Sequence, residues 1–303
     1  MPEIPDIEAY IEALRLRLLG RELQGIRLAS PFALRTVDPP LEAVAGGRIE
    51  GIVRLGKRIV LEVTPREADG SLFLVIHLMI AGRLRWKKPG APLPRGSGIA
   101  AFDFVDGTLV LTEAGTKRRA SLHLVRGQQA LAALDPGGVD LSAANADMLG
   151  AVLRRTNQTL KRALTDPGVV SGIGNAYSDE ILHKARLSPF KQTRALNEIE
   201  IDRLHRAATE VLAEWTERLR LEARESFPEK VTAFRPEMAV HGRFGSACPV
   251  CGASIERIVY AENECNYCPG CQTEGRILAD RALSRLLKDE WPNRVRHNRD
   301  QEV

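Results

Sequence analysis

The first 247 residues contain no cysteine, and the chain also lacks the signals of export and of membrane insertion. Its N-terminus, MPEIPDIEAY, carries acids where a signal peptide would carry Lys or Arg. No apolar run is long enough to span a bilayer, and the sequence has neither an internal repeat nor a low-complexity tract. We therefore expect a soluble, cytoplasmic protein without a membrane partner.

The chain also lacks a large excess of either charge: the formal net charge is only +4, and the pI is near 8.9. This mild excess permits a nucleic-acid partner but does not require one, since many basic proteins bind nothing anionic. The 303 residues are enough for two or three domains with a buried core.

The N-terminal half has a short helical pattern followed by strand patterns. Apolar residues recur at helical spacing over residues 5–19, and Gly20 ends the run. From about 22 to 126 short β-rich runs follow one another, and Asp106-Gly107 between two of them predicts a hairpin. The pattern predicts an antiparallel sandwich or barrel with one leading helix.

The second half begins after a segment with Pro and two Gly, LAALDPGGVDL at 130–140, which is typical of an interdomain linker. We then expect two short helices within 145–166, further helices at 175–185 and 198–223, and short strands around the cysteines from 236. A last amphipathic stretch ends at Pro292.

All five cysteines lie within 24 residues near the C-terminus, which indicates a metal site in a reducing compartment. Two CxxC knuckles are separated by sixteen residues, a zinc-ribbon spacing that closes a tetrahedron of thiolates. The predicted ligands of one structural Zn²⁺ are Cys248, Cys251, Cys268 and Cys271. Cys265 is predicted to be a free thiol, because its use as a ligand would leave Cys271 unpaired.

Five segments stand out in order along the chain. They are MPEIPDIE at the N-terminus, VRLGKRIVLEV at 53–63, HLMIAGRL at 77–84, SGIGNAYSDEIL at 171–182 and VHGRFGSACPVC at 240–251. Together they resemble the formamidopyrimidine-DNA glycosylase and endonuclease VIII family, whose members begin MPELPEVE and carry a GIGNIYADEAL signature. The resemblance covers almost the whole chain.

The resemblance implies an α+β multidomain fold and a monomer. Residues 1–132 would form an N-terminal antiparallel β-sandwich with a leading helix. Residues 133–235 would form a helical domain with a helix–two-turns–helix motif, and 236–280 a zinc finger. Residues 281–303 would form a C-terminal extension, with a short helix on the finger as the simplest expectation.

The resemblance also implies catalytic roles for three residues. Pro2, exposed after removal of Met1, would attack C1′ of a damaged nucleotide as a secondary amine; an α-amino group has a pKa of about 8, so part of it is neutral at working pH. Glu3 would handle protons at the sugar, and Lys57 would contact phosphate and support elimination. The implied reaction excises an oxidised or ring-opened base and then cleaves the abasic site.

Further residues match DNA contacts of the family. Asn175 follows a glycine-rich turn and opens a helix, where backbone N–H groups can face a phosphate. The other matches are Lys161 on the preceding helix, the paired Arg118 and Arg119, and Arg243 on the strand that leads into the finger.

Four positions depart from the family. Asp6 replaces a Glu, Ile80 replaces a Met that fills the gap left by the extruded base, and Ala120 replaces a wedging Phe. Asn263 stands where the family's finger arginine holds a phosphate. These changes affect how the protein opens DNA and do not affect the nucleophile. Substrates whose bases are already poorly paired or poorly stacked should therefore be favoured.

Two other functions stay open from the sequence. The scaffold could serve a non-catalytic protein that binds damaged DNA, which the departures at Ile80, Ala120 and Asn263 allow. A zinc-ribbon protein of transcription or translation would fit the cysteines but leaves the first 240 residues unexplained. The expected partner in the preferred interpretation is damaged DNA, whether duplex, single-stranded or abasic.

Overall fold

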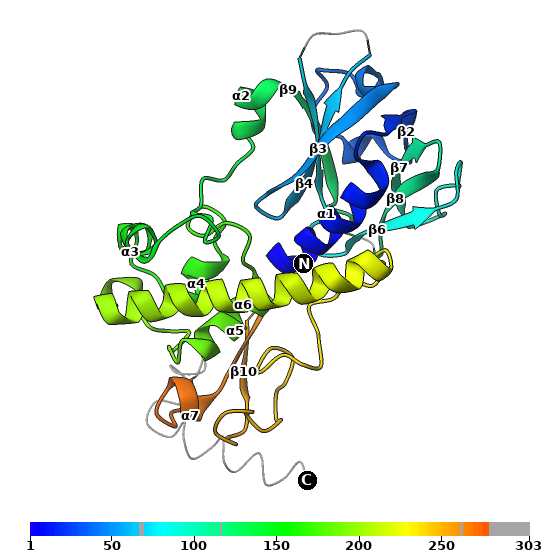
Figure 1. Ribbon diagram of the computed structural model, residues 1–303. Coiled ribbons are helices and arrows are strands. Elements are labelled where there is room, and N and C mark those ends of the chain that lie inside the picture. Colours follow the sequence, from blue (N-terminus) through cyan, green and yellow to red (C-terminus); the bar gives the residue numbers. More distant parts are fainter. Residues whose placement is uncertain (67–69, 116, 261–262, 279–303) are drawn as a thin grey trace. The chain divides into compact units, whose positions relative to one another are not determined.

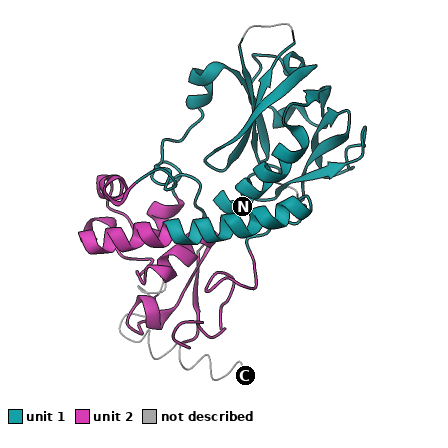
Figure 2. Cartoon of the chain, viewed as in Figure 1, with its two compact units in different colours: residues 1–144, 166–174, 209–233 teal, residues 145–165, 175–208, 234–303 magenta. Residues whose placement is uncertain are grey.

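The computed structural model describes residues 1–66, 70–115, 117–260 and 263–278. The predicted extension at 281–303, with the amphipathic stretch before Pro292, lies outside the described residues. The described chain forms two compact units (Figure 2). One comprises residues 1–144, 166–174 and 209–233, and the other comprises 145–165, 175–208 and the chain from 234.

The first unit begins with helix α1 (Ile4–Leu18) and contains two antiparallel sheets (Figure 1). The five-stranded sheet has the order β1-β3-β4-β5-β9 and the four-stranded sheet the order β2-β7-β8-β6. Their strands are β1 (Glu22–Leu23), β2 (Gly25–Leu28), β3 (Gly47–Leu55), β4 (Arg58–Thr64), β5 (Leu72–His77), β6 (Gly82–Lys87), β7 (Gly98–Phe104), β8 (Gly107–Glu113) and β9 (Ser121–Arg126). Short 3-10 helices lie at Pro31–Ala33 and Leu41–Val44. The predicted β-sandwich with a leading helix is confirmed.

One hydrophobic cluster joins α1 to side chains from both sheets, including Tyr10, Leu61 and Phe102. A second cluster packs helix α2 (Gly127–Ala132) through Leu131 on the other face of the five-stranded sheet, against Val75. Burial of both faces explains why β5 has a continuous apolar sequence rather than an alternating one.

The predicted hairpin at Asp106-Gly107 is confirmed, with Phe104 paired to Gly107 across the turn. Gly107 is required for packing, since a Cβ there would lie 2.2 Å from the Trp86 ring of β6. The sheet pairing therefore depends on a close approach that only glycine permits.

The second unit contains short helices and the cysteine segment. Its elements are α3 (Ala146–Arg155), α4 (Leu160–Thr165), α5 (Asn175–Lys184), a 3-10 turn at Thr193–Ala195, the start of α6 (Glu198–Glu225), β10 (Glu256–Tyr260), β11 (Asn263–Tyr267) and α7 (Pro269–Gln272). The predicted helices match these bounds closely. The strands predicted from 236 begin only at Glu256, because the preceding residues form turns.

Two buried acids of α5 attach the cysteine segment to the helices. Glu180 accepts hydrogen bonds from the backbone N–H groups of residues 239, 240 and 241, at 2.8, 2.9 and 2.9 Å. The neighbouring Asp179 accepts from Lys161 Nζ at 2.5 Å and pairs with His241 Nδ1 at 2.8 Å. It also accepts from the backbone N–H of Asn266 at 3.1 Å, which ties β11 to α5.

We predict that Asp179→Asn destabilises the second unit by about 3–5 kcal/mol, because it leaves the buried Lys161 without its counter-charge. Burial alone would raise the pKa of Asp179, but Lys161 and His241 hold it below its ordinary value. The carboxylate therefore stabilises the fold fully above pH ~4, and this contribution is lost as the pH falls toward the folded-state pKa.

Thermal unfolding of the full chain from pH 3 to pH 7 measures both effects. The exposed Asp202 of α6 provides a matched control, since Asp202→Asn should change stability by less than ~0.5 kcal/mol. Equal unfolding curves for the two variants at pH 7 would contradict the role given to Asp179.

Candidate active site and metal centre

The N-terminal residues predicted to be catalytic are buried at the start of α1. Pro2 is buried, and Glu3 is only 2% exposed. Glu3 is the N-cap residue of α1, and its backbone N–H donates to the Asp6 carboxylate at 3.0 Å. A carboxylate at the third helical position commonly closes a helix N-terminus in this way. Asp6, which is shorter than the family's Glu, reaches this hydrogen bond.

The glycine-rich turn before α5 holds the Glu3 carboxylate. The backbone N–H of Gly174 donates to Glu3 Oε2 at 2.6 Å, and Gly172 O accepts from Ile4 N at 3.1 Å. A Cβ at Gly174 would lie 2.7 Å from Glu3 Cδ, and one at Gly172 would lie 2.3 Å from Ile4 Cγ1. The glycines are therefore needed for packing against the N-terminus, a role that the sequence analysis did not assign to them.

Burial of the N-terminal amine favours its neutral form. Burial lowers the pKa of the Met1 ammonium; Glu3 opposes this shift, whereas Arg83 and Lys57 add to it. Lys57 follows Gly56 in the turn between β3 and β4, and burial lowers its pKa while Glu3 opposes the shift. An amine in these surroundings is more often unprotonated, as a nucleophile requires.

Three predicted DNA contacts of the first unit lie on exposed turns. Ile80 is 50% exposed and follows Met79, whose φ is +52°, in the turn between β5 and β6. Arg118 and Arg119 are exposed before β9, and the backbone N–H of Arg119 donates to the buried Glu113 at 2.8 Å. Ala120, by contrast, is 4% exposed and belongs to the core of the sandwich.

The predicted contact between Lys161 and a phosphate does not fit the geometry. Lys161 is 3% exposed, and its Nζ donates to Asn175 O, Ser178 Oγ and Asp179 Oδ1 at 2.7, 2.9 and 2.5 Å. An ammonium has three donors, and all three have acceptors here. Lys161 therefore fixes the backbone at the start of α5 from inside the unit.

The remaining predicted contacts lie in the second unit. Asn175 is half-buried and is the first residue of α5. Arg243 lies in a turn rather than in the expected strand, and its guanidinium donates to Pro236 O. Asn263 opens β11 opposite Tyr260, and its side chain lies outside the described residues.

The four cysteines predicted to bind zinc lie together. Cys248 Sγ is 3.8 Å from Cys271 Sγ, and Cys251 Sγ is 3.4 Å from Cys268 Sγ. Burial raises the pKa of Cys268 to about 11, so this thiol needs a cation before it ionises at neutral pH. Such a donor set fits Zn²⁺. Cys265 lies apart from it, fully buried against Ile258 and Tyr267.

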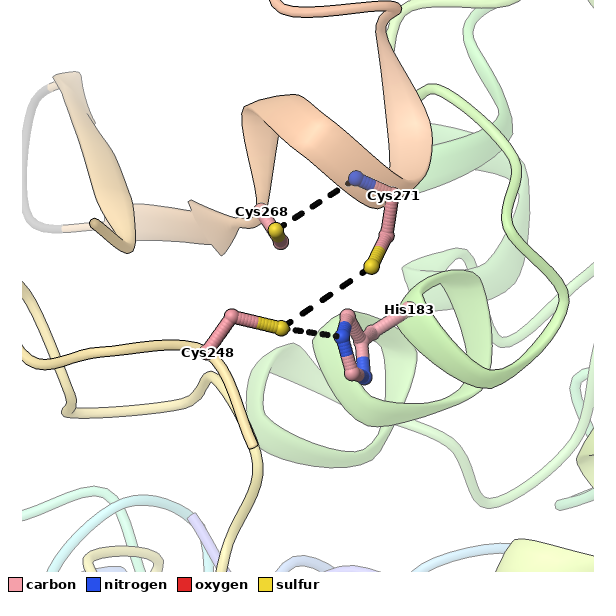
Figure 3. A group of neighbouring side chains, drawn as sticks. All are labelled: His183, Cys248, Cys268 and Cys271. Atoms are coloured by element: carbon pink, nitrogen blue, oxygen red, sulfur yellow. Dashed lines mark hydrogen bonds between the residues drawn. The ribbon is translucent and has the colours of Figure 1, made fainter. Parts of the chain in front are cut away.

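The structure adds His183, which the sequence analysis missed. The ligand atoms of His183, Cys248, Cys268 and Cys271 all lie within 4.8 Å of one another (Figure 3). His183 Nε2 is 3.3 Å from Cys248 Sγ. The two CxxC knuckles already supply four ligands, so the sequence held no reason to look for a fifth donor 65 residues upstream.

Comparison with known proteins assigns the family. Residues 1–121 match the formamidopyrimidine-DNA glycosylase N-terminal domain, and residues 133–222 match the formamidopyrimidine-DNA glycosylase H2TH domain. The formamidopyrimidine-DNA glycosylase of Thermus thermophilus is 32% identical over 290 residues, which cover 91% of this chain and all of that protein. The chain belongs to the formamidopyrimidine-DNA glycosylase family.

A shorter relative and two solved structures agree with this assignment. An uncharacterized formamidopyrimidine-DNA glycosylase-like protein of Mycobacterium tuberculosis is 41% identical over 160 residues, 52% of this chain and 95% of its own. The Lactococcus lactis Fpg in complex with abasic-site DNA has a TM-score of 0.77 at 26% identity, over 89% of this chain and 99% of that chain. MutM in complex with DNA containing carbocyclic 8-oxo-G has the same TM-score and identity, over 90% of this chain and all of that chain. Within the described residues, no helix is long and apolar enough to cross a membrane.

We predict that Gly174→Ala lowers excision of damaged bases by about a hundredfold, because the added methyl displaces the Glu3 carboxylate by an ångström or more. Gly168→Ala, in the turn that precedes this glycine-rich segment, is the matched control, since its Cβ would meet no atom closer than 3.4 Å. Single-turnover excision rates and thermal unfolding of both variants test this. Full activity of a folded Gly174→Ala protein would show that Glu3 needs no fixed position.

Proposed function

We propose that this protein is a bifunctional DNA glycosylase and abasic-site lyase of base excision repair, with Pro2 as nucleophile. The observation that carries the proposal is the buried Glu3 carboxylate, next to Pro2 in sequence and held at 2.6 Å by the N–H of Gly174. A buried, oriented acid beside an amine whose surroundings favour the neutral form is the arrangement that imine chemistry at a sugar needs.

The proposed reaction begins once Met1 has been removed. The Pro2 nitrogen donates its lone pair to C1′ of the nucleotide as the bond between C1′ and the base breaks, and the base leaves with a proton. Glu3 accepts the proton that the attacking amine loses and passes it to the ring oxygen, so that the sugar opens and an iminium ion forms. Removal of a C2′ proton then expels the 3′ phosphate, and water releases the enzyme from the imine. The electron sink is the iminium, so no oxidant is needed.

Other residues have supporting roles in the proposal. Lys57 would contact the phosphate near the lesion, and the exposed Arg118 and Arg119 would hold the opposite part of the backbone. Asn175 and Arg243 would contact phosphates from the second unit, with Lys161 acting indirectly through the carbonyl of Asn175. The partner is damaged DNA, and the domain partition at 132, 235 and 280 is part of the same proposal.

One structural Zn²⁺ would be held by Cys248, Cys251, Cys268 and Cys271. Four thiolates fill the coordination sphere, so the metal supplies folding energy to the cysteine segment and no activated water.

Covalent chemistry at Pro2 is the central prediction. Borohydride added during turnover should reduce the imine and leave a protein–DNA adduct on the N-terminal residue, detectable by mass spectrometry of the tryptic peptide. A residue fused before Pro2 should abolish trapping, because it converts the amine into an amide. Pro2→Gly keeps an amine of altered basicity and should trap more slowly.

Two results would count against this prediction. Efficient trapping with a blocked N-terminus would make a lysine, such as Lys57, the nucleophile. Tight binding of abasic DNA without trapping, by a protein whose Met1 has been removed, would favour the non-catalytic binder instead.

The substrate preference follows from the turns that face the DNA in this proposal. Pulling a stacked, paired base out of a duplex costs a few kcal/mol. Ala120 is buried in the core and has nothing to insert, whereas Ile80 is exposed at the end of its turn. Ile80 is shorter and stiffer than the family's Met. We therefore expect abasic sites, single strands, bubbles and mismatched lesions to be processed better than fully paired lesions.

Ile80→Met should raise excision from a fully paired duplex by roughly fivefold relative to the same lesion in a single strand, equivalent to ~1 kcal/mol of extrusion energy. Cleavage of a preformed abasic site should not change, since no base has to be extruded. Val105→Met, at the exposed turn between β7 and β8, is the control. Wild-type excision of 8-oxoguanine from a paired duplex as fast as abasic-site cleavage would overturn the preference.

A further inference from the structure

The cysteine cluster has a fifth polar donor from outside the cysteine segment. His183 lies in the last turn of α5, is 5% exposed, and points its ring at the cluster (Figure 3). Its Nε2 is 3.3 Å from Cys248 Sγ. The backbone N–H of Val250 lies 3.4 Å from the same sulfur, and the N–H of Cys271 lies 3.4 Å from Cys268 Sγ. His183 thus adds a side-chain contact to the backbone contacts that each knuckle makes for itself.

The four thiols are enough to fill a zinc site without the imidazole. Zinc in structural sites is almost always four-coordinate, with sulfur ligands about 2.3 Å from the metal. That geometry places neighbouring sulfurs a little under 4 Å apart, close to the separations of 3.8 and 3.4 Å in the two measured pairs. Five donors therefore compete for four positions. Those of His183, Cys248, Cys268 and Cys271 lie within 4.8 Å of one another, and Cys251 lies 3.4 Å from Cys268, so the two knuckles together supply four sulfurs beside the imidazole.

The chemistry of the His183 imidazole and the Cys248 sulfur decides which of them donates the hydrogen bond. A zinc-bound thiolate has no proton and can only accept a hydrogen bond. An imidazole carries at least one ring N–H and can donate it, whereas the thiolate has nothing to donate. The separation of 3.3 Å suits an N–H···S contact when Nε2 carries that proton.

We propose that His183 is a positioning residue of the zinc centre: its Nε2–H donates to the Cys248 thiolate and makes zinc retention depend on helix α5. This inference rests on the proposed zinc site. A donor in the outer shell lowers the charge on the sulfur and fixes its direction, and loss of such a donor typically weakens metal binding 10- to 100-fold.

Helix α5 makes this contact part of a larger attachment. Asp179 and His183 are four residues apart and so lie on one helix face, where each holds a different part of the cysteine segment. Gln272 adds a contact after the helix: its Nε2 donates to Leu187 O at 3.0 Å, and its Oε1 accepts from Cys268 N at 2.8 Å. Loss of zinc should therefore loosen α5, the helix that Asn175 begins, and not only the knuckles.

The experiment compares the full-length wild type with His183→Phe, which keeps an aromatic ring but has no donor, and His183→Gln, which keeps an N–H. Zinc content is measured by mass spectrometry, and zinc release is followed with a chelating dye. His183→Phe should release zinc at least tenfold faster than the wild type, and His183→Gln should fall between them. His205→Phe, at a half-buried histidine of α6, should release zinc like the wild type.

Replacement of zinc by Co²⁺ separates a hydrogen bond from a metal bond. The intensity of sulfur-to-cobalt charge transfer scales with the number of bound thiolates, and the visible bands report the ligand set. The wild type and His183→Phe should both give a four-thiolate spectrum. A wild-type spectrum of three thiolates and one imidazole, changed in His183→Phe, would overturn the inference by making His183 a ligand.

The remaining outcomes are also decisive. Equal zinc release from the wild type, His183→Phe and His183→Gln would overturn the role of His183 while leaving the zinc site intact. A wild-type protein purified without zinc, and unable to take up Co²⁺, would instead refute the zinc site on which the inference rests.

Discussion

The hydrogen bond from the backbone N–H of Gly174 to the carboxylate of Glu3 ties the proposed active site to the glycine-rich turn. It joins residues 171 positions apart and adds to the capping contacts that Glu3 and Asp6 make at the start of α1. The contact is charge-assisted and buried, so it is stronger than an average hydrogen bond and costly to leave unmade. Because Gly172 also accepts from Ile4 N, the first residues cannot move without the turn. The proposed chemistry at Pro2 depends on this restraint.

Buried carboxylates have a comparable role in the second unit, where the small cysteine segment has little core of its own. Glu180 satisfies three backbone N–H groups, and Asp179 meets a lysine, a histidine and a strand N–H. Each charge is matched by several donors, the condition under which a buried ion stabilises rather than destabilises a fold. The proposed metal ligation would act on the same short segment as these contacts.

The sequence predicted what local patterns encode. Helices followed from apolar spacing, strands from short β-rich runs, and the cysteine cluster from the spacing of two CxxC knuckles. The sequence did not predict features that depend on contacts between segments far apart along the chain. Lys161 is buried together with Asp179, which pairs with its ammonium. Ala120 is buried where its backbone N–H donates to the Glu113 carboxylate. His183 was missed for the same reason, because no spacing rule connects a helix residue to a knuckle 65 positions later.

The residues proposed for catalysis and those proposed for selectivity differ in how much substitution their surroundings allow. Glu3, Gly172 and Gly174 are enclosed by backbone contacts that a substitution would break, so the arrangement at the N-terminus tolerates little change. Ile80 lies on an exposed turn and Arg118 in an exposed loop, where, under the proposed function, a new side chain would alter only the contact with DNA. Ala120 has no such freedom: a phenylalanine there would have to enter the packed core of the sandwich, where overpacking typically costs about 1–3 kcal/mol. A family-like side chain that fills the gap is therefore easier to restore at Ile80, whose exposed turn can accept a longer side chain without repacking the sandwich.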